Sequence, residues 1–443
     1  MLINTHACRK PNAKVGTFFR AGLIFELILR RFYVDTMRMR VIFFERHDDH
    51  KPMLRANPNL RSIAVLVSLL ITCLVGATIL RTTLGRPVVP TGKPPVIAMG
   101  WSISTSAIRD IHFSNSGQYV STVTADGKVT CYDQAGKQVF VSTVPNADRA
   151  VVSPDAKCTL VYSHLNPMNT TLTFLDSTGQ VDWTMDVSGA VWSADSALCR
   201  AGAYFAVGTG NRYVYLVTIG PRAKRYRRWR APGAVVSVVF NADSQSLTYG
   251  TWETSSICRS DLSGHRDWQN DADPACLQYV QSLWESDRLL SLSVPNNANS
   301  DGEASLLDSD GTPLATCEMD SSNAAHAISC PNGAFICVGY KKSIQHSNKS
   351  VLERHAALYD SSGRVLWDKG SMLMQLAPIL VTKGGFVLVD DGKKALFVVS
   401  PSGELKQSCR LPSTMVSSIV SRDGSRALVK CANEKAYLLK ITQ

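Results

Sequence analysis

The sequence predicts an all-β fold, an eight-bladed β-propeller that follows a single N-terminal transmembrane helix. Two patterns predict the propeller. Short β-branched runs alternate with turn residues every 8–12 positions from residue 96 onward, and one type of turn recurs eight times. A third observation, one long uncharged apolar run, predicts the helix. Seven blades is the alternative if one divergent unit is not a true blade.

Residues 1–61 form a basic tail, with 12 Lys or Arg side chains against 5 Asp or Glu. Basic residues before a membrane span favour the cytoplasmic side, so we expect the N-terminus inside and the C-terminal bulk outside. A further hypothesis is that the natural start is Met53. Only Arg55 and Arg61 would then precede the apolar run, which is the usual form of a signal anchor.

Residues 62–80 read SIAVLVSLLITCLVGATIL and carry no charge. A helix of this length rises about 28 Å, close to the roughly 30 Å of a bilayer's hydrocarbon core. A buried core helix rarely stays apolar on every face, and a cleaved signal peptide lies nearer the N-terminus. We therefore expect a single pass through the plasma (cytoplasmic) membrane, with an extracytoplasmic propeller. Residues 81–94 are rich in Pro and Gly and predict a stiff linker.

In the domain expected at 95–443, a similar turn sequence recurs at regular intervals. Ser or Asn follows an apolar strand end, and Asp, Asn or Gly then tolerates the tight backbone of a hairpin. Successive copies start 39 to 52 residues apart, and a second turn follows each of the first seven. Two hairpin turns in a unit of this length give four strands, the content of a propeller blade. The eight copies stand at 113–117, 152–156, 192–196, 240–244, 284–288, 329–333, 381–385 and 420–424.

The eighth unit lacks its outer strand. Its second turn is missing, and the sequence ends on a third strand at 436–442. Residues 95–103 read as a lone strand before the first unit. Pairing these two segments completes an eighth blade from both ends of the domain and removes two open edges.

Three of the second turns continue to a tryptophan four residues after the glycine, at Trp183, Trp268 and Trp367. This Asp-x-x-Gly-x-x-x-Trp pattern resembles the quinoprotein-like propeller repeat, and the first turns look more like WD40-like repeats. The resemblance implies that these tryptophans dock blade against blade. Quinoprotein dehydrogenases also carry two adjacent cysteines over their cofactor, and no two cysteines are adjacent here. We therefore expect a membrane-anchored, non-catalytic branch, with no cofactor, no metal and no catalytic residue.

The formal net charge of +11 is concentrated in the N-terminal tail and in one cluster of basic residues. The tail carries +7, and residues 81–443 without one cluster of six basic residues carry −2. This distribution argues against nucleic-acid binding, which needs a basic face that tracks phosphates. The cluster is most simply interpreted as a charged outer edge strand that prevents edge-to-edge pairing, and the functional hypothesis is a cationic finger for an anionic partner. The cluster consists of Arg222, Lys224, Arg225, Arg227, Arg228 and Arg230.

Ten of the cysteines fall within the expected propeller, and none has the spacing of a zinc site. Most sit in strand-like segments where a small buried residue fits. Cys330 and Cys337 flank a predicted hairpin turn, and a disulfide between them is our best expectation in an oxidising compartment.

These features together predict a membrane-tethered scaffold that binds a protein or an anionic polymer. Two alternatives remain open: an extracytoplasmic enzyme with its site in the propeller channel, and a membrane sensor with a cytoplasmic basic tail. Carboxylates or histidines that converge on one channel mouth would favour the enzyme. An apolar or aromatic groove on one face would favour the scaffold.

Overall fold

The computed structural model describes residues 93–442, with gaps. The gaps fall at 105–107, 167, 200–201, 221–223, 272–274, 296–301, 320–323, 347–348 and 372–376. The chain divides into two compact units, 1–84 and 85–443, and every described residue belongs to the second. The basic tail, the expected helix at 62–80 and most of the linker lie outside the described residues. No helix long and apolar enough to cross a membrane occurs within the described part.

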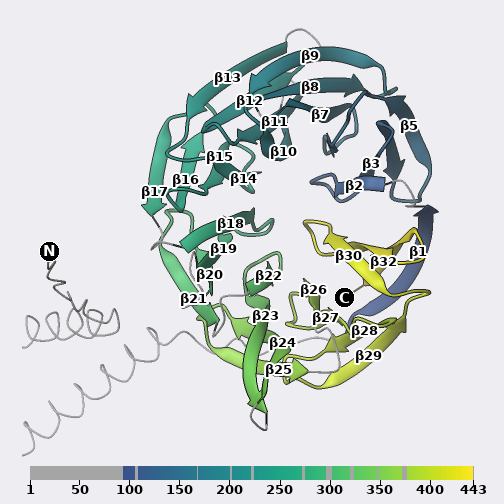
Figure 1. Ribbon diagram of the computed structural model, residues 1–443, viewed down its shortest axis with the longest axis vertical. Helices are drawn as coiled ribbons and strands as arrows, with labels where there is room; N and C mark the ends of the chain where they lie inside the picture. Colours follow the sequence, from purple (N-terminus) through teal and green to yellow (C-terminus); the bar gives the residue numbers. More distant parts are fainter. Residues whose placement is uncertain are drawn as a thin grey trace, which may run out of the picture. The chain divides into compact units, whose positions relative to one another are not determined.

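The described residues form eight four-stranded antiparallel sheets, arranged as blades around a central axis (Figure 1). The prediction of an eight-bladed propeller is therefore confirmed. Seven of the blades take four consecutive strands each, and the first of the four lies next to the axis.

The bounds of blades 1 to 4 are as follows. Blade 1 is β2 (Ile108–Phe113), β3 (Tyr119–Thr124), β4 (Lys128–Asp133) and β5 (Gln138–Thr143). Blade 2 is β6 (Arg149–Val152), β7 (Cys158–Asn166), β8 (Asn169–Asp176) and β9 (Val181–Ser188). Blade 3 is β10 (Val191–Cys199), β11 (Gly202–Thr209), β12 (Tyr213–Ile219) and β13 (Lys224–Arg230). Blade 4 is β14 (Val235–Phe240), β15 (Ser246–Thr251), β16 (Ser256–Asp261) and β17 (Arg266–Asp271).

Blades 5 to 8 complete the ring. Blade 5 is β18 (Ala275–Ser282), β19 (Leu289–Pro295), β20 (Gly302–Leu307) and β21 (Pro313–Met319). Blade 6 is β22 (Ala324–Ser329), β23 (Phe335–His346), β24 (Lys349–Asp360) and β25 (Val365–Ser371). Blade 7 is β26 (Ala377–Val381), β27 (Val387–Asp390), β28 (Ala395–Val399) and β29 (Leu405–Arg410). Blade 8 is β30 (Met415–Val420), β31 (Arg426–Cys431), β32 (Lys435–Thr442) and β1 (Val96–Ser104).

Blade 8 joins both ends of the domain. β1 pairs antiparallel with β32, with Val96 opposite Thr442 and Ile103 opposite Ala436. The order β1-β32-β31-β30 makes β1 the outer strand that the last repeat lacks, and Figure 1 shows it beside the C-terminal strands. The ring therefore closes through backbone hydrogen bonds between segments far apart in the sequence.

Side chains within the turns explain why the repeat is visible in the sequence. Ser153 accepts a hydrogen bond from the backbone N–H of Cys158 at 3.1 Å and donates one to Asp155 at 2.8 Å. In the second turn of the same blade, Asp176 accepts hydrogen bonds from the backbone N–H groups of Thr178 and Gln180. Each turn thus carries its own acceptor, which is the reason that Ser, Asn and Asp recur there.

One of the eight predicted turns is wrong. Residues 192–196 lie inside β10, where Asp195 is paired with Ala206 of β11. The hairpin of blade 3 turns instead between Cys199 and Gly202. The composition at 192–196 is that of a turn, but pairing with β11 keeps these residues extended. Because β10 is an inner strand, Asp195 lies on the channel side of the ring.

Candidate functional site

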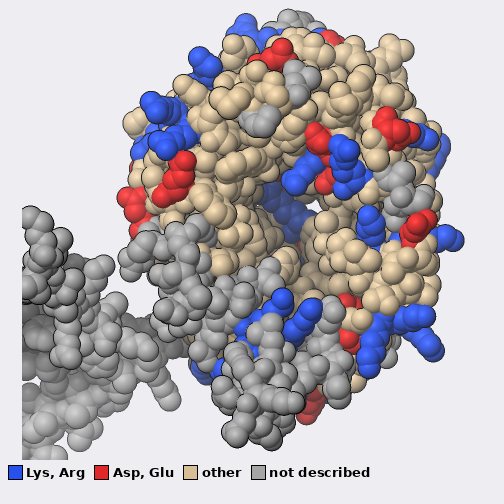
Figure 2. Space-filling view, in the orientation of Figure 1, with Lys and Arg blue, Asp and Glu red and all other residues tan. Residues whose placement is uncertain are grey.

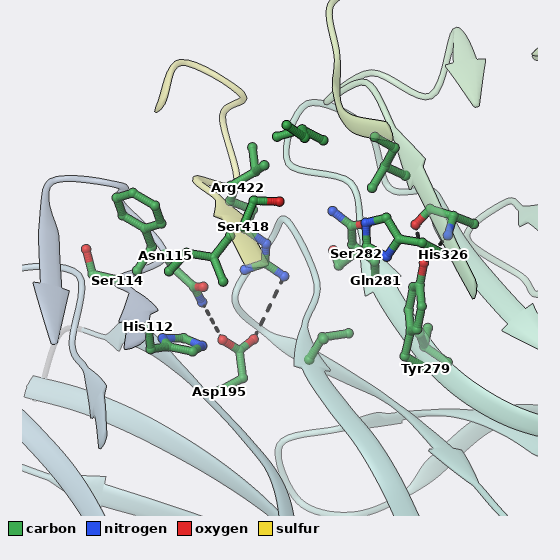
Figure 3. A pocket seen from close by; sticks show the side chains of 18 residues that line it. His112, Ser114, Asn115, Asp195, Tyr279, Gln281, Ser282, His326, Ser418 and Arg422 are labelled. Carbon is green, nitrogen blue, oxygen red and sulfur yellow. Dashed lines mark hydrogen bonds and ion pairs between the residues drawn. The ribbon is translucent and has the colours of Figure 1, made fainter. Parts of the chain in front are cut away.

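A cavity of about 620 Å³ lies on the axis of the ring. Its lining comes from the inner strands and first turns of seven of the eight blades (Figure 3). Figure 2 shows the ring in space-filling form, with an opening at its centre and both basic and acidic side chains on the rim. The polar side chains of its lining include His112, Asn115, Asp195, Tyr279, His326 and Arg422.

At one end of this cavity, Asp195 of blade 3 meets Arg422 of blade 8. Nη2 of Arg422 donates to the carbonyl oxygen of Phe240 at 2.6 Å and lies 3.8 Å from Oδ2 of Asp195. Asp195 also accepts hydrogen bonds from Nδ2 of Asn115 at 2.8 Å and from the backbone N–H of Phe240 at 2.7 Å. The network therefore joins blades 1, 3, 4 and 8 across the axis.

Because the network is buried, Asp195 and Arg422 depend on each other to remain charged. The side chains of Arg422 and Asp195 are 11% and 9% exposed, and a charge taken out of water needs an opposite charge or hydrogen bonds to remain ionised. The guanidinium carbon of Arg422 also lies 5.8 Å from the ring centre of Trp284, a cation–π distance. The site thus presents two charged groups that already compensate each other.

The wall of the cavity carries two further rings from blades 5 and 6. The hydroxyl of Tyr279 donates to the carbonyl oxygen of Ala327 and accepts from its backbone N–H at 2.8 Å. His326 is exposed to the lumen but enclosed by the surrounding blades, and this enclosure lowers its pKa below the usual value. His326 is therefore neutral at pH 7.

His112, on β2, adds an unsatisfied group. Its Nδ1 atom is buried and has no hydrogen-bond partner among the described residues. Buried polar atoms are paired in most native proteins, so an exception in a cavity wall needs an explanation.

Where β2 begins, a second polar cluster joins blades 1 and 2. Asp148 accepts a charged hydrogen bond from Arg109 at 2.7 Å and contacts Nδ1 of His164 at 2.7 Å. Burial of Asp148 opposes its ionisation, but the hydrogen bonds from His164 and the charge of Arg109 hold its pKa below the usual range. The carboxylate is thus occupied by neighbouring side chains, which gives it a structural role.

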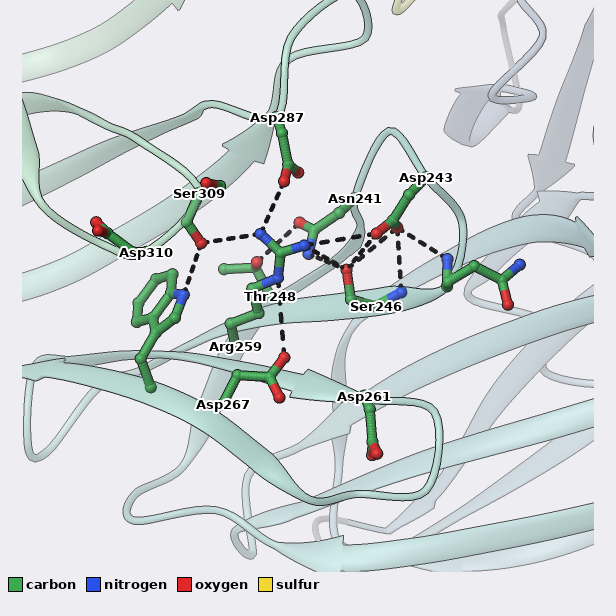
Figure 4. Close-up of polar contacts among 12 residues, drawn as sticks. Asn241, Asp243, Ser246, Thr248, Arg259, Asp261, Asp267, Asp287, Ser309 and Asp310 are labelled. Carbon is green, nitrogen blue, oxygen red and sulfur yellow. Dashed lines mark hydrogen bonds and ion pairs between the residues drawn. The ribbon is translucent and has the colours of Figure 1, made fainter.

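Arg259 of blade 4 forms a third polar cluster (Figure 4). Its side chain is 13% exposed, and Nη1 donates to the carbonyl oxygen of Ser309 at 2.9 Å and lies 3.1 Å from Asp287. Nη2 donates to Ser246 at 3.0 Å. Because Ser309 and Asp287 belong to blade 5, this guanidinium fastens two blades together. No group of three or more His, Cys, Asp or Glu side chains is placed to hold a metal ion within the described ranges.

The predicted basic cluster is a strand and not a finger. Lys224 to Arg230 form β13, and Lys224 already pairs with Ile219 of β12, so only residues 220–223 connect the two strands. The predicted projecting loop is wrong at Lys224 and Arg225, because backbone pairing with β12 extends to the start of β13. Arg222 lies outside the described residues. We call Lys224, Arg225, Arg227, Arg228 and Arg230 the basic strip.

The basic strip is exposed along its length. Nζ of Lys224 pairs with Asp182 of blade 2 at 2.6 Å, and Arg228 lies 5.1 Å from the ring centre of Tyr213. Among the described side chains no ion pair involves Arg225, Arg227 or Arg230. The outer strand of blade 3 therefore carries positive charge that no described residue pairs with at Arg225, Arg227 or Arg230.

The predicted docking tryptophans pack where neighbouring blades meet. A Cβ atom built on Gly311 of blade 5 would lie 2.8 Å from Cε3 of Trp268, and Nε1 of Trp268 donates to Ser309 at 2.8 Å. In blade 6, Trp367 packs with its Cβ and Cγ atoms against Gly403 of blade 7. Trp183 stacks on Phe174 of its own blade, with ring centres 5.4 Å apart, and packs against the hydrophobic cluster that blades 2 and 3 share.

The expected disulfide between Cys330 and Cys337 is not formed. Both cysteines are buried free thiols. Sγ of Cys330 accepts a hydrogen bond from the backbone N–H of Phe335 at 3.2 Å and donates one to Asn332 at 3.0 Å. These are the contacts that Ser153 makes in blade 2, so Cys330 serves as a turn cap.

The sequence interpretation missed Asp195 and Arg422. Arg422 stands third in its turn copy, as Asn115 does in the first copy, and both side chains reach Asp195. Aligning the copies would have placed these two residues on one rim of the channel. Asp195 itself gave no such signal, because its segment has the composition of a turn.

Comparisons with known proteins support the fold and nothing finer. No protein-family model matches the chain, and no curated protein matches it. Among solved structures, the Dos1 propeller is similar, with a TM-score of 0.60 and 10% identity over 78% of this chain and 95% of that one. A Kuenenia stuttgartiensis hydrazine synthase matches 67% of this chain and 96% of its own, with a TM-score of 0.48 and 13% identity. The first likeness supports a β-propeller, and the second carries no argument.

Proposed function

We propose that this protein is a membrane-tethered scaffold whose propeller binds an acidic partner protein through the basic strip. The observation that carries the proposal is the set of five exposed basic side chains on β13, three of which form no ion pair among the described residues. Like charges close together repel each other, so such a strip weakens the free protein slightly and gains from an acidic partner.

Protection of a sheet edge accounts for the strip less well. One or two charges suffice to keep an outer strand from pairing with another chain. The other described outer strands are less basic: β9 carries two Asp and no basic residue, β17 carries one Arg and two Asp, and β29 carries one Lys and one Arg. β13 carries five basic residues and no acidic one. Its composition is thus that of an electrostatic docking surface.

The tether is proposed from the sequence. The uncharged run at 62–80 would anchor the chain in the plasma membrane, with the basic tail in the cytoplasm and the propeller outside. Washing membranes at alkaline pH tests the anchor. We expect the full chain to stay in the membrane fraction and a variant without residues 62–80 to be released. Release of both would reject the anchor.

The docking surface is tested by titrating the full chain, held in uncharged lipid nanodiscs, with polyglutamate. We expect Arg225→Ser/Arg227→Ser/Arg230→Ser to weaken binding by at least about tenfold at low salt, and added salt to reduce this difference. The matched control is Lys128→Ser/Lys137→Ser/Lys157→Ser, which removes the same charge from exposed positions in blades 1 and 2. An equal loss in both variants would show that net charge alone binds polyglutamate. Binding to anionic vesicles in preference to polyglutamate would replace the protein partner by a membrane.

A further inference from the structure

The cavity on the axis combines an apolar wall with a fixed polar end. The wall is formed by aliphatic side chains from five inner strands, and the Asp195–Arg422 pair stands at one end (Figure 3). The volume of about 620 Å³ falls within the roughly 300–1,000 Å³ of sites that hold small molecules. The aliphatic residues are Val239, Val280, Ile328, Ile379, Ile419 and Val420.

The wall offers no charge to a charged ligand. Asp195 and Arg422 compensate each other, and their remaining contacts go to Asn115 and to the backbone of Phe240. His326, the ring exposed to the lumen, is neutral at pH 7 because its enclosure disfavours the protonated form. A ligand ion would leave water without gaining an opposite charge, so the cavity discriminates in favour of uncharged molecules.

His112 supplies the hydrogen-bonding group that the protein leaves unused. Its buried Nδ1 atom has no partner among the described residues, although the ring lines the cavity. Because this atom is closed off from water, a ligand in the cavity reaches it only after the imidazole ring turns, and a hydroxyl, carbonyl or amide group would then satisfy it. The geometry thus favours a ligand with an apolar body and a polar group that can reach His112.

We propose that the propeller channel binds one small uncharged molecule, with an apolar body against the aliphatic wall and a hydroxyl, carbonyl or amide group paired with His112. This site is independent of the basic strip, which lies on the outer strand of blade 3. The fit is to a small molecule and not to a polymer, because the ring of inner strands surrounds the site.

Benzophenone is a suitable probe, because it is uncharged, has two apolar rings and one carbonyl, and crosslinks to nearby C–H bonds under ultraviolet light. The full chain in uncharged nanodiscs is irradiated with increasing benzophenone, and the crosslinked peptides are mapped by mass spectrometry. We expect saturable labelling of peptides that contain Ile379, Ile419 or Val239. The anionic analogue 4-benzoylbenzoate should label them at least about tenfold less, because its carboxylate finds no partner.

Two cavity variants and one matched control complete the test. Ile419→Trp fills the cavity and should reduce channel labelling at least about tenfold. Val416→Trp places the same side chain on the same strand at a position that is 62% exposed and outside the cavity, so labelling should not change. If Ile419→Trp does not fold, Ile379→Trp makes the same test from blade 7. Labelling that persists when either folded variant fills the cavity, or equal labelling by the anionic analogue, overturns the proposal.

His112→Phe tests the polar contact separately, because it keeps a flat ring and removes the nitrogen. We expect saturation to need several-fold more benzophenone in this variant. An unchanged saturation curve would reject the role of His112.

Discussion

Arg422 of blade 8 places its Nη2 atom 3.8 Å from Oδ2 of Asp195 in blade 3 and donates from the same atom to Phe240 of blade 4. Blades 4 and 8 stand opposite each other in an eight-membered ring. Most contacts in the propeller join a blade to its neighbours, whereas this one spans the channel. The ring is therefore braced across its axis as well as around its circumference.

Asp195→Ala should lower the free energy of unfolding by about 3 kcal/mol, because it leaves the buried Arg422 without its opposite charge and the Phe240 N–H without an acceptor. Urea unfolding followed by circular dichroism measures the change. Asp267→Ala is the control, since Asp267 is 43% exposed and 4.0 Å from Nε of Arg259, and it should cost less than about 1 kcal/mol. Similar costs for the two variants would contradict a cross-channel brace.

Gly311→Ala should destabilise the propeller by roughly 1–3 kcal/mol, because Gly311 has φ +83° and the new methyl group would press on Trp268. The same change in a Trp268→Ala background should cost at least about 0.5 kcal/mol less, since the steric part of the penalty is gone. The remaining cost reports the backbone strain alone. Strict additivity in this double-mutant cycle would show that the tryptophan does not press on the turn.

Cys330→Ser should leave the stability nearly unchanged, because a hydroxyl can accept from Phe335 and donate to Asn332 as the thiol does. Cys330→Ala removes the cap and should cost about 1 kcal/mol. Thermal unfolding with and without a reducing agent is the measurement. A large loss in both variants that the reductant reproduces in the wild type would instead reveal a disulfide.

Deletion of residues 95–103 should lower the melting temperature by more than about 5 °C, because it removes the outer strand of blade 8 and opens the ring. Differential scanning calorimetry of the full chain checks this result. A deletion of residues 81–89 in the linker, outside the described part, serves as the control for shortening the chain. An unchanged melting temperature after loss of 95–103 would refute closure by β1.

Burial raises the pKa of Asp390 to about 6, and the neighbouring charge of Asp391 adds to the effect. The unfolded chain releases this proton near pH 4 and the folded protein only near pH 6, so this group makes stability fall as the pH rises through that window. Asp390→Asn should remove that decline. The test compares urea unfolding of the wild type and the variant at pH 4.5 and pH 6.5. A difference between the two proteins that does not change with pH would contradict the raised pKa.

The turns made the architecture predictable from the sequence. Ser153, Asp155 and Asp176 bond to backbone groups within a few residues, so their contacts leave a local pattern at every repeat. Counting two turn types then indicated eight blades and a strand shared by both ends of the domain.

The channel was not predictable in this way, because its contacts are not local. Asp195, Phe240 and Arg422 are far apart in the sequence and meet only when the ring has closed. The position of the basic strip was also not predictable from local sequence. The sequence showed the charges of β13, but only pairing with β12 decided that Lys224 and Arg225 belong to a strand. The disulfide expected at Cys330 was wrong for a related reason. Spacing alone cannot distinguish a thiol that caps a turn from one that forms a disulfide.

The two strands that close blade 8 are synthesised at different times. A ribosome makes β1 at residues 96–104 and its partner β32 only at 435–442. At 5–20 residues per second the first strand waits on the order of 20–60 s before it can pair. Throughout that time its edge, with Val96 and Met99 exposed even in the finished ring, is open to other nascent chains. The last strand to be synthesised is therefore the one that gives the first strand its partner.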